Sequence, residues 1–238
     1  MSIKFVLISF SYRYLSSSSG EYVGLTGAKL DGAEMLACGL ATHFVPSTRL
    51  TALETDLWGV DSNDPNFVST ILNAYTQHPH LKQHSANHRQ LLDVIDRCFS
   101  KRTVEEIISA LEREATQEPN DWISTTIRAL KKASPSSLKI SLRSIREGRL
   151  QGVGQCLIRE YRMVCNLMKG DISRDFEEGC RAILVDKDRN PKWEPRQLKD
   201  MKDSMVDQYF ERVDEEGWED LKFPPRKNVH VSRIIAKL

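Results

Sequence analysis

A succession of helix start signals constrains the fold of this chain more than any other feature, and it extends from residue 64 to residue 213. Ser134 precedes Pro135, an order typical of a capping side chain followed by the first residue of a helix. Thr103 and Glu106 have the spacing of a capping box, in which two backbone N–H groups at a helix start find side-chain acceptors. Because apolar residues at helical spacing follow these signals, the chain is predicted to be mainly α-helical.

Each predicted helix has one apolar side that we expect to face the core. Further start signals are Asp64, Asp121 and Ser173, and two helices are expected to end at Gly148 and Gly170. The apolar sides are, in chain order, Phe67, Ile71, Leu72 and Tyr75; Leu91, Leu92, Ile95 and Phe99; Ile107, Ile108 and Leu111; Trp122, Ile123, Ile127 and Leu130; Leu138, Leu142 and Ile145; Leu157, Tyr161, Val164 and Met168; Phe176, Cys180, Ile183 and Leu184; and Met201, Met205, Tyr209 and Val213.

The segment 20–47 combines a short helix with an extended stretch. Asp31 and Glu34 have capping-box spacing, which predicts a helix start at this point. The stretch 41–45 is short and apolar and is ended by Pro46, so we expect a brief buried strand or extended segment.

Composition narrows the classes of function. The 238 residues, 40% hydrophobic and 28% charged, are typical of a globular protein, and the net charge of +1 gives no electrostatic reason to expect a nucleic-acid partner. No apolar run is long enough to span a membrane, so no membrane partner is expected. The cysteines are odd in number and form no CxxC pair, which favours free thiols in a reducing compartment over a disulfide framework or zinc ribbon. They are Cys38, Cys98, Cys156, Cys165 and Cys180.

The two ends of the chain differ from the rest. Residues 1–10 form a short apolar run that resembles a signal peptide but lacks a convincing cleavage site, so a replaced or mis-spliced N-terminus is the preferred interpretation. The chain ends in Ala236, Lys237 and Leu238, a close variant of the Ser-Lys-Leu tripeptide that the peroxisomal import receptor reads. We therefore expect a peroxisomal location, with the mitochondrion or the cytosol as alternatives.

Several motifs resemble the crotonase superfamily and, within it, the 3-hydroxyisobutyryl-CoA hydrolases of plants. The last motif is specific enough to favour these hydrolases over general enoyl-CoA hydratases. The resemblance divides the chain into a divergent segment 1–19, a hydrolase-like region 20–223 and a tail 224–238. The motifs are Leu25-Thr26-Gly27; Gly39-Leu40-Ala41-Thr42-His43-Phe44-Val45; Ser134-Pro135-Ser136-Ser137-Leu138-Lys139; Glu160-Tyr161-Arg162; and Phe176 to Ala182 followed by Asp186-Lys187-Asp188 and Pro191-Lys192-Trp193.

The resemblance implies the mainly helical C-terminal part of a crotonase-type α/β fold, with few short strands. It also implies hydrolysis of the 3-hydroxyisobutyryl-CoA thioester in valine catabolism, with CoA as part of the substrate and with no separate cofactor or metal. The family polarises the thioester carbonyl with two backbone N–H groups and uses a Glu of a PE motif and an Asp of an FPD.G motif, all upstream of the LTG segment. Residues 1–19 contain no Glu, Asp or Gly, so no catalytic residue is assigned and this chain is expected to be inactive alone.

Two alternative functions stay open. One is a non-catalytic isoform or interaction protein that associates with a full-length homologue. The other is an enoyl-CoA hydratase or isomerase. In either case, helices that pack on the β-spiral of the family are expected to leave an exposed apolar face here.

Four groups of residues are weighed as sites. Glu21, the first acidic residue, is interpreted as a solvated helix residue. Trp193 is a candidate contact for CoA by resemblance, against burial as a packing anchor. Three histidines at i, i+4 and i+8 have metal-ligand spacing but polar surroundings, and a solvated face is favoured. Five arginines on two predicted helices are interpreted as surface charge, with contact to CoA phosphates as the alternative. The histidines are His80, His84 and His88; the arginines are Arg143, Arg146, Arg149, Arg159 and Arg162.

Overall fold

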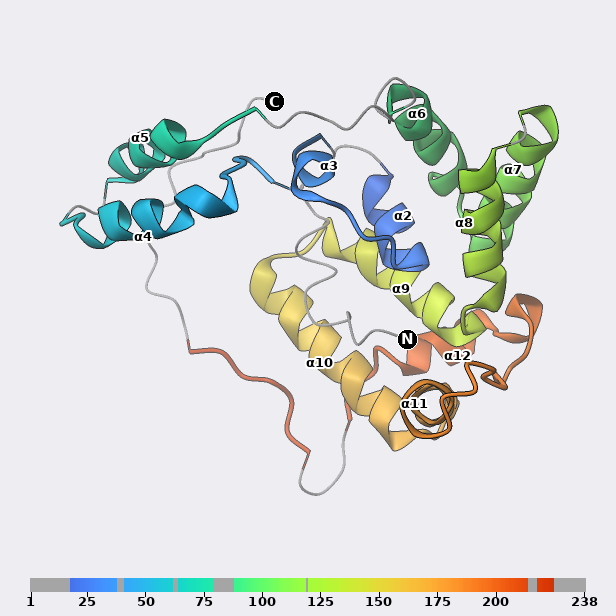
Figure 1. The fold of residues 1–238 in the computed structure, drawn as a ribbon. Helices are drawn as coiled ribbons and strands as arrows, with labels where there is room; N and C mark the ends of the chain where they lie inside the picture. Colours follow the sequence, from blue (N-terminus) through green and yellow to red (C-terminus); the bar gives the residue numbers. More distant parts are fainter. Residues whose placement is uncertain are drawn as a thin grey trace.

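The computed structural model describes residues 18–37, 41–61, 64–78, 88–118, 120–213 and 218–224. Within these ranges the chain forms helices joined by turns and loops, and no strand is found (Figure 1). The mainly α-helical prediction is therefore confirmed for the described residues, whereas the few short strands are absent from them. No helix among these residues has both the length and the apolar character that a membrane crossing requires.

Five helices enclose the first hydrophobic core. Helix α2 lies against α6, α8 and α9, and α7 packs against both α6 and α8 (Figure 1). Their predicted apolar sides supply most of the core, including Phe99, Ile107 and Leu111, which are fully buried. The helices are α2 (Ser19–Thr26), α6 (His88–Phe99), α7 (Val104–Gln117), α8 (Asp121–Lys132) and α9 (Pro135–Gly148).

Most helix starts follow the predicted capping chemistry, but Asp121 and Ser173 do not: the residue before α11 (Asp175–Cys180) is Arg174, which makes no side-chain cap bond. The Thr103 hydroxyl accepts from the Glu106 N–H at 3.1 Å while the Glu106 carboxylate accepts from the Thr103 N–H at 3.4 Å, so the capping box is confirmed. Ser134 caps α9 as predicted. Asp121 is not the cap of α8, because the Asn120 side chain accepts from the Trp122 N–H at 2.8 Å and Asp121 is the first helical residue.

A second, smaller core joins α9 to the C-terminal part of the chain. Helix α10 (Val153–Lys169) ends before Gly170, as predicted, and a 3₁₀ turn, η6 (Leu198–Asp200), precedes α12 (Asp203–Gln208). The predicted final helix is therefore much shorter than expected. Its apolar residues are nevertheless largely buried, because the turns on either side of α12 continue into the core. The core residues are Ile140, Met163, Leu167, Met201, Val206 and Tyr209.

Besides the side predicted for α5 (Pro65–Tyr75), which buries no residue, the predicted apolar sides of α10 and of the segment that follows α11 do not face the core. On α10 the side that carries Tyr161, Val164 and Met168 is exposed, and the opposite side is buried. After α11 (Asp175–Cys180), the π-helical turn η5 (Arg181–Val185) likewise exposes Ile183, Leu184 and Val185, although it buries Ala182. The apolar sides of these elements were predicted correctly as patterns but wrongly as buried surfaces, since spacing alone does not show which side meets a neighbour.

The N-terminal third contains a helical hairpin that projects from the two cores. Helix α4 (Leu50–Trp58) follows the 3₁₀ turn η3 (Ser47–Arg49) and packs on α5 (Pro65–Tyr75), which starts at the predicted Asp64 cap (Figure 1). The hairpin buries only Leu53, and the Trp58 side chain is 84% exposed.

The segment between α2 and the hairpin also differs from its prediction. The capping box that starts α3 (Gly32–Ala37) is confirmed, with Asp31 and Glu34 exchanging two bonds of 2.7 and 2.9 Å. Residues 41–45 are neither a strand nor fully buried, because no described strand lies beside them to pair with.

Candidate functional site

Glu21 is a buried, paired carboxylate and not the solvated helix residue that was predicted. Its side chain lies where α2 packs on α9, and only 1% of the residue is exposed. One carboxylate oxygen accepts from Arg149 at 2.6 Å, and the other lies 3.6 Å from Arg146. A buried charge requires a partner of this kind because its removal from water is costly. No local signal in the sequence pairs Glu21 with these arginines, of which Arg146 lies in the last turn of α9 and Arg149 directly follows the helix.

Arg146 also caps the C-terminal end of α6. Its guanidinium donates to the carbonyl oxygens of Phe99, Lys101 and Arg102 at 2.5–3.2 Å. Phe99 is the last residue of α6 and the other two directly follow it, so these carbonyls have no intrahelical N–H partner. Arg146 therefore links α2, α6 and α9 through one planar group.

The other three arginines are engaged by acceptors of the same chain. Arg143 pairs with Glu147 at 2.7 Å and with Asp207, and Arg162 pairs with Asp220. Arg159 is buried, and it donates to the Ser144 carbonyl at 2.8 Å and to Gln151 at 2.5 Å. The interpretation as ordinary surface charge is wrong for Arg159. Contact between any of the five arginines and a CoA phosphate would have to compete with these intramolecular bonds.

The Phe176–Trp193 motif is organised around Arg181. Its guanidinium contacts the carboxylates of Glu178, Asp186 and Asp188 at 2.7, 2.5 and 2.8 Å. The Arg181 hydrogen bonds, together with the Lys192 N–H, lower the pKa of Glu178 to about 2. We refer to these four side chains as the Arg181 network.

The Arg181 network fixes a loop with an unusual backbone. Lys187 and Arg189 have φ values of 56° and 53°, in the left-handed region that costs a non-glycine residue about 1–2 kcal/mol. Asp188 accepts from the Asn190 N–H at 2.9 Å, and Glu178 accepts from the Lys192 N–H at 2.6 Å. The charged residues of this motif therefore shape the loop, which carries the chain to Trp193.

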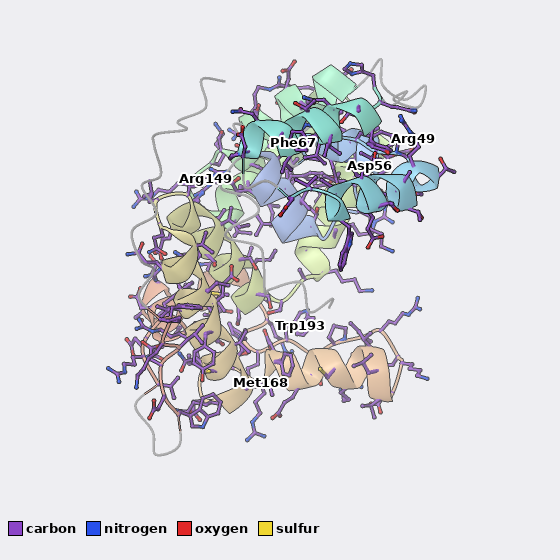
Figure 2. All side chains as sticks on the ribbon, turned by 90° about the vertical axis from the view of Figure 1, so that its left-hand side faces the viewer. Arg49, Asp56, Phe67, Arg149, Met168 and Trp193 are labelled. Carbon is purple, nitrogen blue, oxygen red and sulfur yellow. The ribbon has the colours of Figure 1, made fainter. Side chains whose placement is uncertain are left out.

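Trp193 is held at two points. Its indole N–H donates to the Lys132 carbonyl at the end of α8 at 2.9 Å, and the following N–H, of Glu194, donates to Asp175 at 2.8 Å. Asp175 is buried and accepts from Ser134 at 2.6 Å, so the start of α9, the start of α11 and Trp193 form one linked unit. The half-buried indole faces the space between α8 and α11 (Figure 2). These contacts support the interpretation as a packing anchor, and contact with CoA stays a prediction.

The described residues contain no group of three or more His, Cys, Asp or Glu side chains that could hold a metal ion. His80, His84 and the side chain of His88 lie outside the described residues, as do Ala236, Lys237 and Leu238. Burial raises the pKa of the Cys98 thiol to about 11, so this cysteine is a poor nucleophile at neutral pH. The described residues thus supply a scaffold with fixed ion pairs, and we assign no catalytic side chain among them.

Comparison with known proteins identifies relatives over most of the chain. A family model described as enoyl-CoA hydratase/isomerase matches residues 6–210. Two proteins of Arabidopsis thaliana, "Probable 3-hydroxyisobutyryl-CoA hydrolase 3" and "3-hydroxyisobutyryl-CoA hydrolase 1", are each 81% identical to 92% of this chain. The chain spans only 58% and 57% of their lengths. A crystal structure of a carnitinyl-CoA dehydratase from Mycobacterium thermoresistibile is 28% identical, with a TM-score of 0.70 over 88% of this chain and 56% of that one.

Proposed function

Because the chain belongs to the enoyl-CoA hydratase/isomerase family, we propose that it forms the helical part of an acyl-CoA thioester hydrolase that acts on 3-hydroxyisobutyryl-CoA. The observation that carries the proposal is the 81% identity to two proteins named as 3-hydroxyisobutyryl-CoA hydrolases. The Arg181 network supports it further, since it gives the hydrolase-like motif a physical role in this chain. In this proposal, the described residues between α2 and Pro224 supply the structural scaffold of the enzyme.

We further propose that these 238 residues do not hydrolyse the thioester by themselves. Hydrolysis requires donors aimed at the developing oxyanion and a group that activates water. The sequence contains neither the PE nor the FPD.G motif at the expected position, and we assign no replacement among the described residues. The proposal would be overturned by a purified chain that releases free CoA at a rate comparable to the family's.

The test is a thiol-release assay with 3-hydroxyisobutyryl-CoA and the full 238-residue chain. The Arabidopsis 3-hydroxyisobutyryl-CoA hydrolase 1 serves as the positive control. We expect no release above the uncatalysed rate from the chain and rapid release from the control. The same samples are tested for the enoyl-CoA hydratase alternative with crotonyl-CoA. Its hydration is measured as the loss of absorbance of the conjugated double bond.

The cellular setting is a separate proposal. The terminal tripeptide Ala236, Lys237 and Leu238 supports import into the peroxisome by its receptor, where the enzyme would serve valine breakdown. A fluorescent protein fused to the N-terminus should enter peroxisomes and should become diffuse when the tripeptide is deleted. Mitochondrial fluorescence, or cytosolic fluorescence with the tripeptide intact, would contradict this location.

A non-catalytic role is the second candidate. The exposed apolar residues on α10 favour it, because large exposed apolar patches mark binding surfaces. In this role the chain associates with a full-length homologue and alters its activity. Co-purification with the Arabidopsis hydrolase 1, together with a changed rate of CoA release, would support the role, and independent elution of the two proteins would exclude it for that homologue.

A further inference from the structure

The segment 218–224, which we call the strap, lies along α10 and is held there at two points (Figure 1). The Asp220 carboxylate accepts two hydrogen bonds from the Arg162 guanidinium, one of them from Nε at 3.0 Å. Farther along the strap, Phe223 lies over Gly154, where a Cβ atom would be 3.9 Å from the ring. The strap therefore runs in the direction opposite to α10. Three residues of extended chain and eight residues of helix both span about 10–12 Å, so the two contacts are made together.

The strap is otherwise weakly attached. Among the described residues, the Arg162–Asp220 pair is its only hydrogen-bonded link to the rest of the chain, because the pair of Lys222 and Glu219 lies within the strap. The Phe223 ring is 46% exposed, so it is not deeply packed. A segment with few hydrogen bonds and little buried apolar surface opens at a much lower cost in free energy than a packed core.

Cys165 is buried on the side of α10 that faces away from the second core. The core side of the helix carries Met163 and Leu167, and Cys165 is two residues from each, which places it on the opposite side of an α-helix. Only 4% of Cys165 is nevertheless exposed, although it belongs to neither of the two hydrophobic cores. It follows Arg162 by three residues and so lies on the face that the strap crosses. We therefore attribute its burial to the strap.

The strap also affects the chemistry of the Cys165 sulfur. Burial raises the pKa of the Cys165 thiol, and the negative charge of Asp220 raises it further. A raised pKa leaves little of the thiolate, which is the reactive form. Opening of the strap returns water to the sulfur and removes the nearby carboxylate, so both changes favour the thiolate.

We propose that the strap is a latch over Cys165, which opens while both cores stay folded, and that the Arg162–Asp220 pair sets how often it opens. Small thiol-reactive molecules reach the Cys165 sulfur only in the open state. The two side chains of the pair are 31% and 18% exposed, so dissolved ions screen their attraction and added salt favours the open state. The latch is a property of the described part of the chain and is independent of the proposed thioester hydrolysis.

The test is the rate at which iodoacetamide alkylates each cysteine of the full 238-residue chain, measured by mass spectrometry of its peptides. The thiolate sulfur displaces iodide, so the rate reports how often a thiol is both exposed and ionised. Cys98, which is 1% exposed in the first core, reports the opening of that core. In the wild-type chain, Cys165 should react about tenfold or more slowly than it does in the urea-unfolded chain.

Two variants of the strap test its control by the ion pair. Asp220→Asn keeps the size of the side chain but removes its charge, and it should raise the rate at Cys165 about two- to fivefold. Glu219→Gln is the matched control, because Glu219 lies in the same strap but forms its ion pair with Lys222 inside it, and it should leave the rate unchanged. Added salt should raise the rate at Cys165 in the wild-type chain but not in Asp220→Asn.

Faster alkylation of Cys165 in Asp220→Asn, with the rate at Cys98 unchanged, supports the latch. Equal rates at Cys165 in Asp220→Asn and Glu219→Gln would overturn control by the ion pair. A wild-type Cys165 that reacts as fast as in the unfolded chain would show that the strap does not cover it. A parallel rise at Cys98 would show that the first core opens too, which contradicts an independent latch.

Discussion

Helices α7 and α10 both carry apolar residues at helical spacing, but they meet the rest of the protein differently. The predicted apolar side of α7 contains Ile107 and Leu111, and both are fully buried in the first core. The predicted side of α10 is exposed, and its opposite side holds the second core. The difference shows that the spacing of apolar residues identifies a helix and its apolar sides. Which of these sides is buried depends on where other helices pack against it. Four predictions test how buried and exposed contacts differ in their contribution to this fold.

The largest expected effect comes from the ion pair that fixes α2 on the first core. Glu21→Ala should lower the free energy of unfolding by about 3–5 kcal/mol, because it leaves Arg149 without its buried partner. Urea denaturation followed by circular dichroism measures this loss. Glu114→Ala is the control, since Arg97 and Glu114 form an exposed pair between α6 and α7 worth about 0–1 kcal/mol. Equal losses in the two variants would contradict the distinction between buried and exposed pairs.

The contrast between α7 and α10 is tested by truncating one residue on each. Leu111→Ala should cost about 2–5 kcal/mol, because it opens a cavity in a packed core. Met168→Ala should change stability by no more than about 0.5 kcal/mol, because its side chain is largely in water. The comparison fails if thermal and urea unfolding show that Met168→Ala is as destabilising as Leu111→Ala.

A smaller effect is expected at the start of α7. Thr103→Ala should cost about 1 kcal/mol, because it removes the hydroxyl that accepts from the Glu106 N–H. Thr103→Ser retains the acceptor and should recover most of the loss. If both variants are equally destabilised in urea, the capping bond is not the cause.

The smallest effect is a local one and concerns pH. The folded pKa of Glu178, about 2, lies below its ordinary value of 4.5, so its ion pairs stabilise the loop above about pH 4.5 and are lost as pH falls from 4.5 toward 2. Nuclear magnetic resonance of the Glu178 carboxyl should show no titration between pH 7 and 4. Arg181→Ala should raise its pKa toward 4.5, whereas the nearby Arg174→Ala, outside the Arg181 network, should not.

Local chemistry explains which parts of the fold were predictable. The caps at Asp31, Thr103 and Ser134 depend on residues three positions away, so their spacing in the sequence was sufficient. The stretch 41–45 was predicted as a strand from its apolar character, but a strand needs a partner strand that the local sequence does not reveal.

The candidate site was less predictable because its contacts join distant residues. Glu21 and Arg149 lie 128 positions apart, and Ser134 and Asp175 lie 41 apart, so no local pattern connects them. The hydrolase-like motif was visible in the sequence, but the Arg181 network became apparent only once the loop placed three carboxylates around one guanidinium. The resemblance therefore identified the residues of the motif, and the structure shows that their ion pairs fix the loop that leads to Trp193.

The position of Arg146 has a consequence for how the first core opens. Its guanidinium donates to three carbonyls at the end of α6 and lies beside the carboxylate of Glu21. Fraying at the end of α6 therefore removes hydrogen bonds from the same group that compensates a buried charge on α2. The end of α6, the start of α2 and the end of α9 therefore share one opening event. Their backbone amides should exchange with solvent at a common rate, although they are distant from one another in the chain.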